Sequence, residues 1–248
     1  ASVVGFAAVL PAVAGRVMEK ELRSLEKALE KPEKPCIYVL GGAKAEKCVD
    51  IIRYVLEKGV ADKVLTGGLV GHLFLKAKGV ELGKPSDEVL EKKGLAGLVD
   101  AMRELLEAFP GRIEVPVDVA YEEGGRRKEV GVGELPVEKP IMDIGSRTAQ
   151  AYGSILSGAR SVVVSGPLGV YERDLFVDGT KKVFEAATSA SFSLAGGGDT
   201  VAVLRRLGLF GRFSAVSLAG GAFIEYLMGK ELPGVKVLEE AAEKAGKA

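Results

Sequence analysis

Cys36-Ile-Tyr-Val-Leu-Gly-Gly-Ala-Lys44 decides the fold class, because a short apolar run passes through two glycines directly into a helix-like segment. Short apolar runs that do not alternate with polar residues are typical of parallel strands covered on both faces. Glycine permits the tight turn that follows such a strand. The same order returns at Val64–Gly68, Met142–Arg147, Val162–Pro167 and Val216–Gly221. These five units predict an α/β fold, a doubly wound parallel sheet of about six strands in a three-layer, Rossmann-like arrangement.

The expected elements follow from this alternation. Because crossovers between parallel strands are right-handed, all the glycine turns are expected at one edge of the sheet. The charged, glycine-rich residues 122–139 are expected to form an exposed hairpin or loop, and the serine- and alanine-rich segment before Gly196 a helix. Strands are predicted at 36–40, 63–66, 113–121, 141–144, 161–165 and 214–218. Helices are predicted at 12–31, 44–58, 69–76, from 86 to near 110, 146–157, 172–187, 200–207 and 221–229.

Bulk composition excludes several classes of partner. The 34 basic residues balance 34 acidic ones, so no overall charge favours nucleic acid or an anionic membrane. Cys36 and Cys48 are too few for a disulfide framework, and no zinc spacing is present. No apolar run reaches spanning length and no basic leader precedes one. These features favour a reduced, cytoplasmic protein. The apolar start at Ala1 is expected if the chain is a piece of a longer polypeptide.

Gly196-Gly-Gly-Asp-Thr200 is the sixth glycine cluster and the strongest candidate for chemistry. The N–H groups of Gly197 and Gly198, together with the Thr200 hydroxyl, are suited to phosphate at a helix N-terminus. Asp199 repels phosphate unless Mg²⁺ bridges the two. The alternative is that Asp199 is an ordinary N-cap of the next helix. The two interpretations are compatible.

Two other turns carry weaker signals. In Gly41-Gly-Ala-Lys44, Lys44 either neutralises a phosphoryl oxygen or faces solvent beside a tight turn. In the connection from Ser165 to Glu172, Pro167, Leu168 and Val170 are expected to form an apolar shelf for a base. Glu172 either accepts hydrogen bonds from a ribose or lies in the first helical turn, where the helix dipole favours it. Gly41-Gly-Ala-Lys44 matches neither the dinucleotide fingerprint nor the P-loop fingerprint.

The remaining reactive side chains favour structural roles. His72 is the only histidine, and we expect it to pack on a helix rather than serve as a general base. Both cysteines are expected to be buried and inert. Asp143 ends a predicted strand, where a structural role is favoured.

In this order, the motifs resemble the C-terminal, nucleotide-binding half of phosphoglycerate kinase in an archaeal-like version. The resemblance implies an interdomain helix and linker at 1–34, a nucleotide-binding α/β domain at 35–230 and a C-terminal tail at 231–248, with the N-terminal phosphoglycerate-binding domain absent. The stretches that match the family are Gly41–Lys44, Thr66–Gly68, Asp143–Gly145, Gly166–Glu172, Gly196–Thr200 and Leu232–Val235.

The family resemblance also implies roles for individual residues. Lys44 would follow the transferring phosphoryl group, Asp199 would hold the metal, and Gly220 and Gly221 would supply donors where charge develops. Glu172 would bind the ribose. The phosphates would be bound by Gly197, Gly198 and Thr200, and adenosine would be surrounded by Gly42, Gly67, Gly68, Pro167 and Val170. The other residues expected to bind the nucleotide are Gly41, Lys47, Ser165 and Gly166.

Three positions depart from the family pattern. Ser165 stands where the family has an asparagine, and Lys47 follows Lys44 by three positions rather than four. Ser217-Leu-Ala-Gly-Gly221 has one glycine fewer than usual and no threonine hydroxyl. These departures bear on the phosphate contacts.

The implied reaction is reversible phosphoryl transfer from 1,3-bisphosphoglycerate to ADP, with ADP or ATP and Mg²⁺ as cofactors. Without the domain that binds phosphoglycerate, the chain is predicted to be nearly inactive alone. It is expected to be a monomer, with association through the apolar face of residues 12–31 as an alternative. Two other functions stay open: a noncatalytic nucleotide-binding or partner-docking module, and an NAD-dependent oxidoreductase, against which the missing GxGxxG fingerprint argues.

Overall fold

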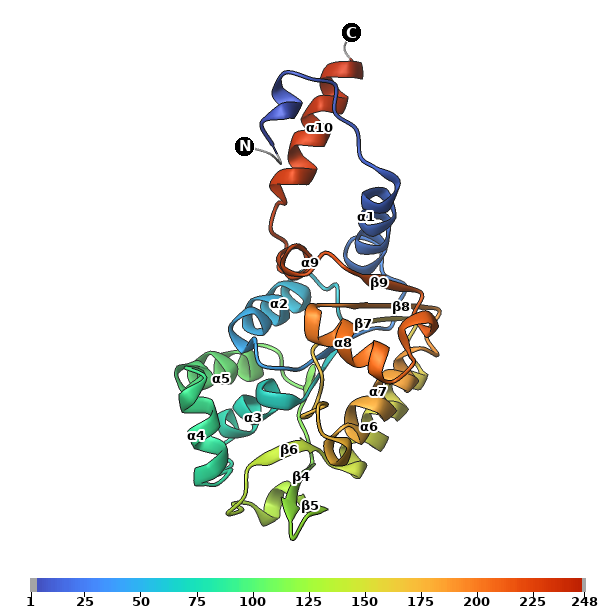
Figure 1. Ribbon diagram of the computed structural model, residues 1–248. Coiled ribbons are helices and arrows are strands. Elements are labelled where there is room, and N and C mark those ends of the chain that lie inside the picture. Colours follow the sequence, from blue (N-terminus) through green and yellow to red (C-terminus); the bar gives the residue numbers. More distant parts are fainter. Residues whose placement is uncertain (1–3, 247–248) are drawn as a thin grey trace.

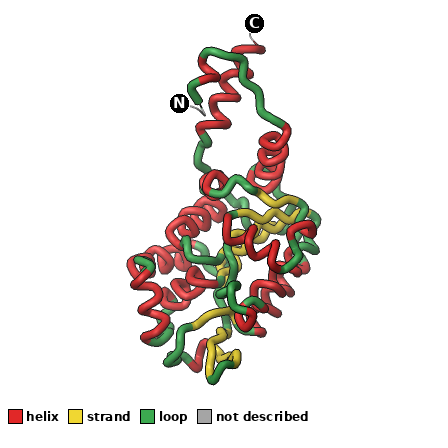
Figure 2. Tube along the Cα trace, in the orientation of Figure 1, coloured by secondary structure: helices red, strands yellow, loops and turns green. Residues whose placement is uncertain are grey.

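The computed structural model describes residues 4–246, and its centre is a six-stranded parallel sheet (Figures 1 and 2). The strands follow the order β3-β2-β1-β7-β8-β9. Every neighbouring pair in this sheet is parallel. The predicted α/β class is therefore confirmed. The strands are β1 (Cys36–Leu40), β2 (Lys63–Thr66), β3 (Ile113–Glu114), β7 (Ser161–Ser165), β8 (Phe192–Gly196) and β9 (Ala215–Ser217).

Helices cover both faces of the sheet, and alternate residues of β1 face the two cores. Tyr38 and Leu40 belong to one core, and Ile37 and Val39 to the other. The first core is closed by α1 (Arg16–Leu29), α2 (Ala45–Glu57), α3 (Gly68–Ala77), α5 (Val99–Ala108) and α9 (Gly221–Leu227). The second is closed by α6 (Ser146–Ser157), α7 (Asp178–Ala187) and α8 (Gly198–Arg206).

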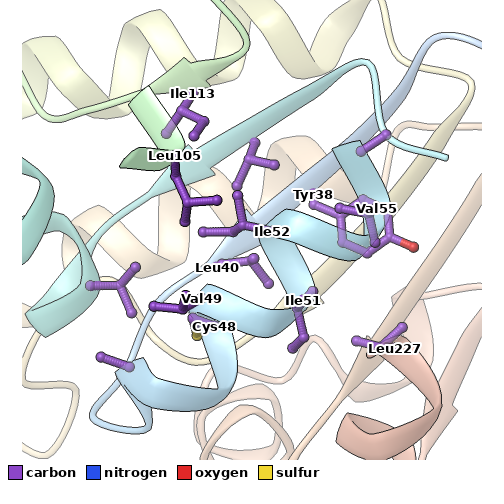
Figure 3. Close-up of a cluster of buried hydrophobic side chains, with 14 of the residues drawn as sticks. Tyr38, Leu40, Cys48, Val49, Ile51, Ile52, Val55, Leu105, Ile113 and Leu227 are labelled. Atoms are coloured by element: carbon purple, nitrogen blue, oxygen red, sulfur yellow. The ribbon is translucent and has the colours of Figure 1, made fainter. Parts of the chain in front are cut away.

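The first core shows how the α2 helix is held on the sheet (Figure 3). Ile52 and Val55 of α2 are fully buried against Tyr38 and Leu40 of β1. The Tyr38 hydroxyl donates to the Ala28 carbonyl oxygen over 3.3 Å, which satisfies the one polar atom of this ring inside the core. The apolar residues of α2 thus hold this helix against the sheet. Because the turn at Gly41–Lys44 leads directly into α2, its position is held as well.

A second, three-stranded antiparallel sheet lies at the end of the molecule opposite α10 (Figure 1). It contains β4 (Asp118–Glu123), β5 (Arg126–Gly131) and β6 (Ile141–Ile144), in the order β5-β4-β6. The β4–β5 hairpin confirms the interpretation of residues 122–139. Strand 141–144 was predicted in the parallel sheet, and this is wrong, because it pairs antiparallel with β4. Its glycine turn therefore does not share the edge of the others.

Three further element predictions are corrected. The segment before Gly196 is not wholly helical, since α7 ends at Ala187 and strand β8 follows. The expected strand 113–121 is divided between β3 and β4, which belong to different sheets. The expected helix from 86 to near 110 is divided into α4 (Lys84–Lys92), a 3₁₀ turn and α5, because Gly94 adopts a φ of +71° and ends α4.

The two ends of the described chain lie together, away from the sheets. The 3₁₀ turn η1 (Phe6–Ala8) contacts α10 (Pro233–Gly246), and both project beyond α1 and α9 (Figure 1). Across residues 4–246, no helix has both the length and the apolar character that crossing a bilayer requires.

His72 of α3 gives the fold a testable pH dependence. Its Nδ1 has no hydrogen-bond partner among the described residues, and burial lowers its pKa from 6.5 to about 4, opposed by the charge of Asp87. A base with a lowered folded-state pKa contributes stability above its unfolded pKa that is lost as the pH falls through the window between the two values. We expect the wild type to lose on the order of 2 kcal/mol relative to His72→Leu between about pH 7 and about pH 4.5, measured by urea unfolding. If the free energy of unfolding had the same pH dependence in both proteins, His72 would not be its source.

Candidate functional site

The glycine turns that follow β1, β7, β8 and β9 surround one cavity of about 270 Å³. The carboxyl ends of parallel strands meet at one edge of a sheet, so four separate stretches of sequence converge there. Twelve residues predicted for the site line this cavity: Gly41, Gly42, Lys44, Lys47, Ser165, Gly166, Gly197, Gly198, Asp199, Thr200, Gly220 and Gly221.

The β1 and β7 turns are packed directly against each other. A Cβ on Gly166 would lie 2.2 Å from the Gly41 carbonyl oxygen, and one on Gly41 would lie 2.3 Å from the Pro167 carbonyl oxygen. The Gly42 N–H donates to the Pro167 carbonyl oxygen over 2.7 Å. Glycine is therefore required here by the approach of the two backbones to one another.

The β8 turn is tied to the β7 turn by a threonine. The hydroxyl of Thr200, which is 1% exposed, accepts a hydrogen bond from the Gly166 N–H over 2.8 Å. This acceptor position is thus occupied within the protein. Gly197 adopts a φ of +96° immediately before α8, a conformation that L side chains rarely adopt.

The charges around the cavity are unbalanced in favour of cations. As far as the structure describes the chain, Lys44 and Lys47 line it together with a single carboxylate, that of Asp199. None of these three side chains forms an ion pair with any residue of the described chain. The site therefore favours an anion.

Three helices begin at the cavity, and their N-termini differ from those of α6 and α7. The carboxylates of Asp118 and Glu129, in the small sheet, accept hydrogen bonds from the first N–H groups of α6. The carboxylate of Asp143, in the same sheet, accepts from the Gly179 N–H of α7. By contrast, α2, α8 and α9 begin at Ala45, Gly198 and Gly221 with no capping side chain from the described residues. Unpaired N–H donors and the positive end of the helix dipole suit phosphate.

Two cavity glycines are not explained by packing or by backbone conformation. A Cβ on Gly198 or Gly221 would meet no heavy atom within 4 Å, and neither residue has a positive φ. Gly220, between β9 and α9, does require glycine, with a φ of +57°. Open space at Gly198 and Gly221 leaves the backbone accessible to a ligand.

The other predicted residues lie beside the cavity rather than in its lining. Gly68 donates its N–H to the Leu168 carbonyl oxygen over 2.8 Å, and a Cβ on Gly67 would collide with the Leu168 side chain. Pro167 is buried, while Val170 is 37% exposed. The prediction that the Leu168 side chain contributes to an apolar shelf for a base is wrong, because that side chain is fully buried and cannot contact a ligand.

Glu172 lies in the long connection after β7, not in the first turn of α7. Its carbonyl oxygen accepts from Arg206 of α8 over 3.1 Å. The pKa of Tyr171 is raised mainly by desolvation and further by the negative charges of Glu172 and Asp199. Both carboxylates therefore lie near this phenol. Glu172 is thus on the α8 side of the site.

The helix after β1 adds residues that the sequence analysis did not assign to the site. Cys48 and Ile51 line the cavity, as does Ile224 of α9. The spacing of Lys44, Lys47, Cys48 and Ile51 places them on one helical face, which is the signal that could have identified them. Burial raises the pKa of Cys48 to about 12, so its thiol is protonated and inert at neutral pH.

The family model of phosphoglycerate kinase matches residues 1–230. The chain belongs to the phosphoglycerate kinase family. It is 47% identical over 240 residues to the phosphoglycerate kinase of Natronomonas pharaonis, covering 96% of this chain and 60% of that protein. It is 44% identical over 248 residues to the enzyme of Thermococcus kodakarensis, covering 98% and 60%.

A solved phosphoglycerate kinase has the same architecture. The crystal structure of the Pyrococcus horikoshii OT3 enzyme matches with a TM-score of 0.91 and 41% identity, covering 98% of this chain and 61% of that one. The chain thus spans about 60% of the length of these relatives. Phosphoglycerate kinases are phosphotransferases, and a cavity that favours an anion is consistent with membership of this family.

Proposed function

We propose that the cavity binds the phosphates of ADP or ATP with Mg²⁺, and that the chain provides the nucleotide side of the phosphoglycerate kinase reaction. The observation that supports this most strongly is the convergence of three helix N-termini and two lysines on one space. Within the described chain, these helix ends have no capping side chain and these lysines have no ion-pair partner. Its volume of about 270 Å³ is below the range of about 300–1,000 Å³ usual for whole drug-sized ligands. It therefore suits a phosphate chain better than a complete nucleotide.

The phosphates would be bound mainly by backbone donors. We assign this role to the N–H groups of Gly197 and Gly198, and to Gly220 and Gly221 across the cavity. Lys44 would neutralise the phosphoryl group that is transferred, and Lys47 would add a second positive charge at the same helix end. Thr200 would hold the β7 and β8 turns together, because its hydroxyl already accepts from Gly166.

The donor set fits magnesium only in the presence of a nucleotide. Among residues 4–246 there is no cluster of three or more His, Cys, Asp or Glu side chains that would hold an ion alone. Mg²⁺ usually binds through one or two carboxylates, substrate phosphates and water. Of the carboxylates in the described part of the chain, Asp199 is the one that lines the cavity. The metal would neutralise charge on the phosphates to which it is bound.

The nucleoside would lie outside the cavity, over the neighbouring turns. The tightly packed backbone at Gly41, Gly42, Gly67 and Gly68 would form the surface against which adenosine lies, and Val170 offers an exposed apolar side chain there. Pro167 would support the adenosine site indirectly, because it is buried and its carbonyl oxygen accepts a hydrogen bond from the Gly42 N–H. The Glu172 carboxylate would accept hydrogen bonds from the ribose hydroxyls.

Phosphoryl transfer at such a site needs positioning and charge stabilisation rather than a nucleophilic side chain. Among residues 4–246, those that line the cavity include lysine but neither arginine nor histidine. We propose that the second substrate, a phosphoglycerate, is bound elsewhere in a full-length enzyme. The 248 residues alone are then expected to show little turnover. Robust kinase activity from these residues, measured by coupled assay, would contradict this part of the proposal.

Calorimetric titration with ADP tests the nucleotide site. We expect binding that requires Mg²⁺ for full affinity, and no comparable binding of NADH. Asp199→Asn is expected to reduce MgADP affinity about tenfold or more, equivalent to about 1.4 kcal/mol. In EDTA it is expected to leave ADP affinity unchanged or to raise it, because the substitution removes a negative charge that repels the phosphates. Asp178→Asn is the matched control, because Asp178 is also an exposed aspartate in the first turn of a helix. Equal effects of the two substitutions would contradict a metal-binding role.

The exposed apolar side chains near α1 lead to a separate proposal about assembly. Val9, Val13 and Val17 are 76%, 88% and 80% exposed. We propose a monomer, in which this surface is where the remaining domain of a full-length enzyme packs. Light scattering that shows concentration-dependent dimers of the 248 residues would favour self-association instead.

A further inference from the structure

The connection between β7 and α7, residues 166–177, is fixed on two sides. On the cavity side, the carbonyl oxygens of Pro167 and Leu168 accept from Gly42 and Gly68. On the other side, the Val170 N–H donates to the Met142 carbonyl oxygen of β6 over 2.7 Å. The small antiparallel sheet therefore supports the segment that carries Val170 and Glu172.

An ion pair joins the two outer strands of the small sheet. The Nη1 of Arg127, in β5, donates to the Oδ2 of Asp143, in β6, over 2.8 Å. The Asp143 side chain is fully buried and that of Arg127 is 17% exposed. Burial raises the pKa of Asp143 to about 6, opposed by Arg127, so the carboxyl is ionised at neutral pH and Arg127 is its counter-ion.

Asp143 lies between the connection and the start of α7. Its Oδ2 accepts from the Gly179 N–H over 3.0 Å. A Cβ on Gly169 would lie 2.3 Å from Oδ1, and a Cβ on Gly179 would lie 2.4 Å from the same atom. The two glycines therefore allow the backbone of the connection to approach the carboxylate closely.

Arg127 also contacts the connection directly. Its Nη1 donates to the Leu175 carbonyl oxygen over 3.0 Å, and its Nη2 donates to the Ile144 carbonyl oxygen over 2.8 Å. Its Nε donates to Glu129, whose other oxygen accepts from Ser146 at the start of α6. One guanidinium thus joins β5, β6 and the 166–177 connection, a geometry that its planar set of donors permits.

We propose that Arg127 and Asp143 are positioning residues for the nucleoside: by fixing the 166–177 connection on the small sheet, they set the placement of Val170 and Glu172. This inference rests on the proposed nucleotide site. Neither residue lines the cavity where the phosphates would bind. The pair is therefore expected to affect recognition of the nucleoside and not of the phosphates.

The test compares two ligands on the same variants. For Arg127→Met we expect MgADP affinity to fall about tenfold or more, while affinity for magnesium pyrophosphate changes less than about twofold. Arg127→Lys keeps the charge but not the planar set of donors, so partial recovery of MgADP affinity is expected. Lys128→Met is the control, because the Lys128–Glu123 pair lies on the same hairpin with both side chains about half exposed.

The outcomes separate the two proposals. If the wild type binds neither ligand, the proposed function fails. If the wild type binds MgADP and Arg127→Met binds it equally well, the positioning role is overturned. Equal loss of both ligands also overturns it, since a general structural defect would weaken both. Should Arg127→Met not fold, as judged by circular dichroism, Arg127→Lys decides the same comparison.

Discussion

Replacement of Gly166 by alanine is expected to lower the free energy of unfolding by about 3–5 kcal/mol. Gly166 has a φ of +88°, and the added Cβ would lie 2.2 Å from the Gly41 carbonyl oxygen and 2.4 Å from the Gly41 carbonyl carbon. Both obstacles are backbone atoms of the neighbouring turn, which cannot move aside as a flexible side chain could. Urea unfolding measures the loss.

Gly79→Ala separates the two causes of this loss. Gly79 has a similar φ of +83°, but a Cβ there would meet nothing within 4 Å. Its substitution is expected to cost only the unfavourable backbone conformation, about 1–2 kcal/mol. If Gly166→Ala were no more harmful than Gly79→Ala, the close contact between the β1 and β7 turns would be refuted.

Alanine at Gly198 or Gly221 is expected to have the opposite effect: reduced ligand binding with no loss of stability. The protein leaves open space at both positions, so the methyl group would meet no protein atom within 4 Å. A phosphate bound against these helix N-termini would meet it, however. Overpacking of about 1–3 kcal/mol corresponds to a roughly 5- to 150-fold loss of MgADP affinity.

The stability of these variants should stay equal to that of the wild type or rise slightly, because alanine is favoured over glycine in helices. Gly97→Ala is the matched control, since a Cβ there also meets nothing within 4 Å and Gly97 does not line the cavity. Calorimetric titration with MgADP measures the affinities. Unchanged affinity in both cavity variants would place the phosphates elsewhere.

The predicted number of strands in the parallel sheet was right, although segment 141–144 was wrongly included in it and β8 was missed. Strand β8 was missed because Ser193 interrupts its apolar pattern. In the fold, the Ser193 hydroxyl accepts from the Ser214 N–H over 3.1 Å, and the Ser214 hydroxyl accepts from the Ser193 N–H over 3.1 Å. This long-range exchange satisfies a buried polar side chain, and no local pattern reveals it.

The segment 141–144 failed as a prediction for a different reason. Its apolar run and glycine turn are equivalent in sequence to those of the parallel strands. Its direction depends on β4, which pairs antiparallel with both β5 and β6. Periodicity shows that a segment is a strand, but the partner determines which sheet the strand enters.

The candidate site was more predictable than the complete topology. Strand ends in a parallel sheet converge, so the turns at Gly41, Gly166 and Gly197 could be grouped from sequence alone. What the sequence did not indicate was which side chains stay accessible. Leu168 faces inward and the Thr200 hydroxyl bonds to Gly166, because both satisfy contacts between elements distant in sequence.

Backbone amide shifts in a ¹⁵N-labelled sample, followed during titration with MgADP, test the proposed site most directly. We predict saturable changes concentrated at Gly41–Lys47, at 166–172 and at the starts of α8 and α9. Changes confined to other regions, such as η1 and α10, or no changes at millimolar MgADP, would contradict a nucleotide site at the glycine turns.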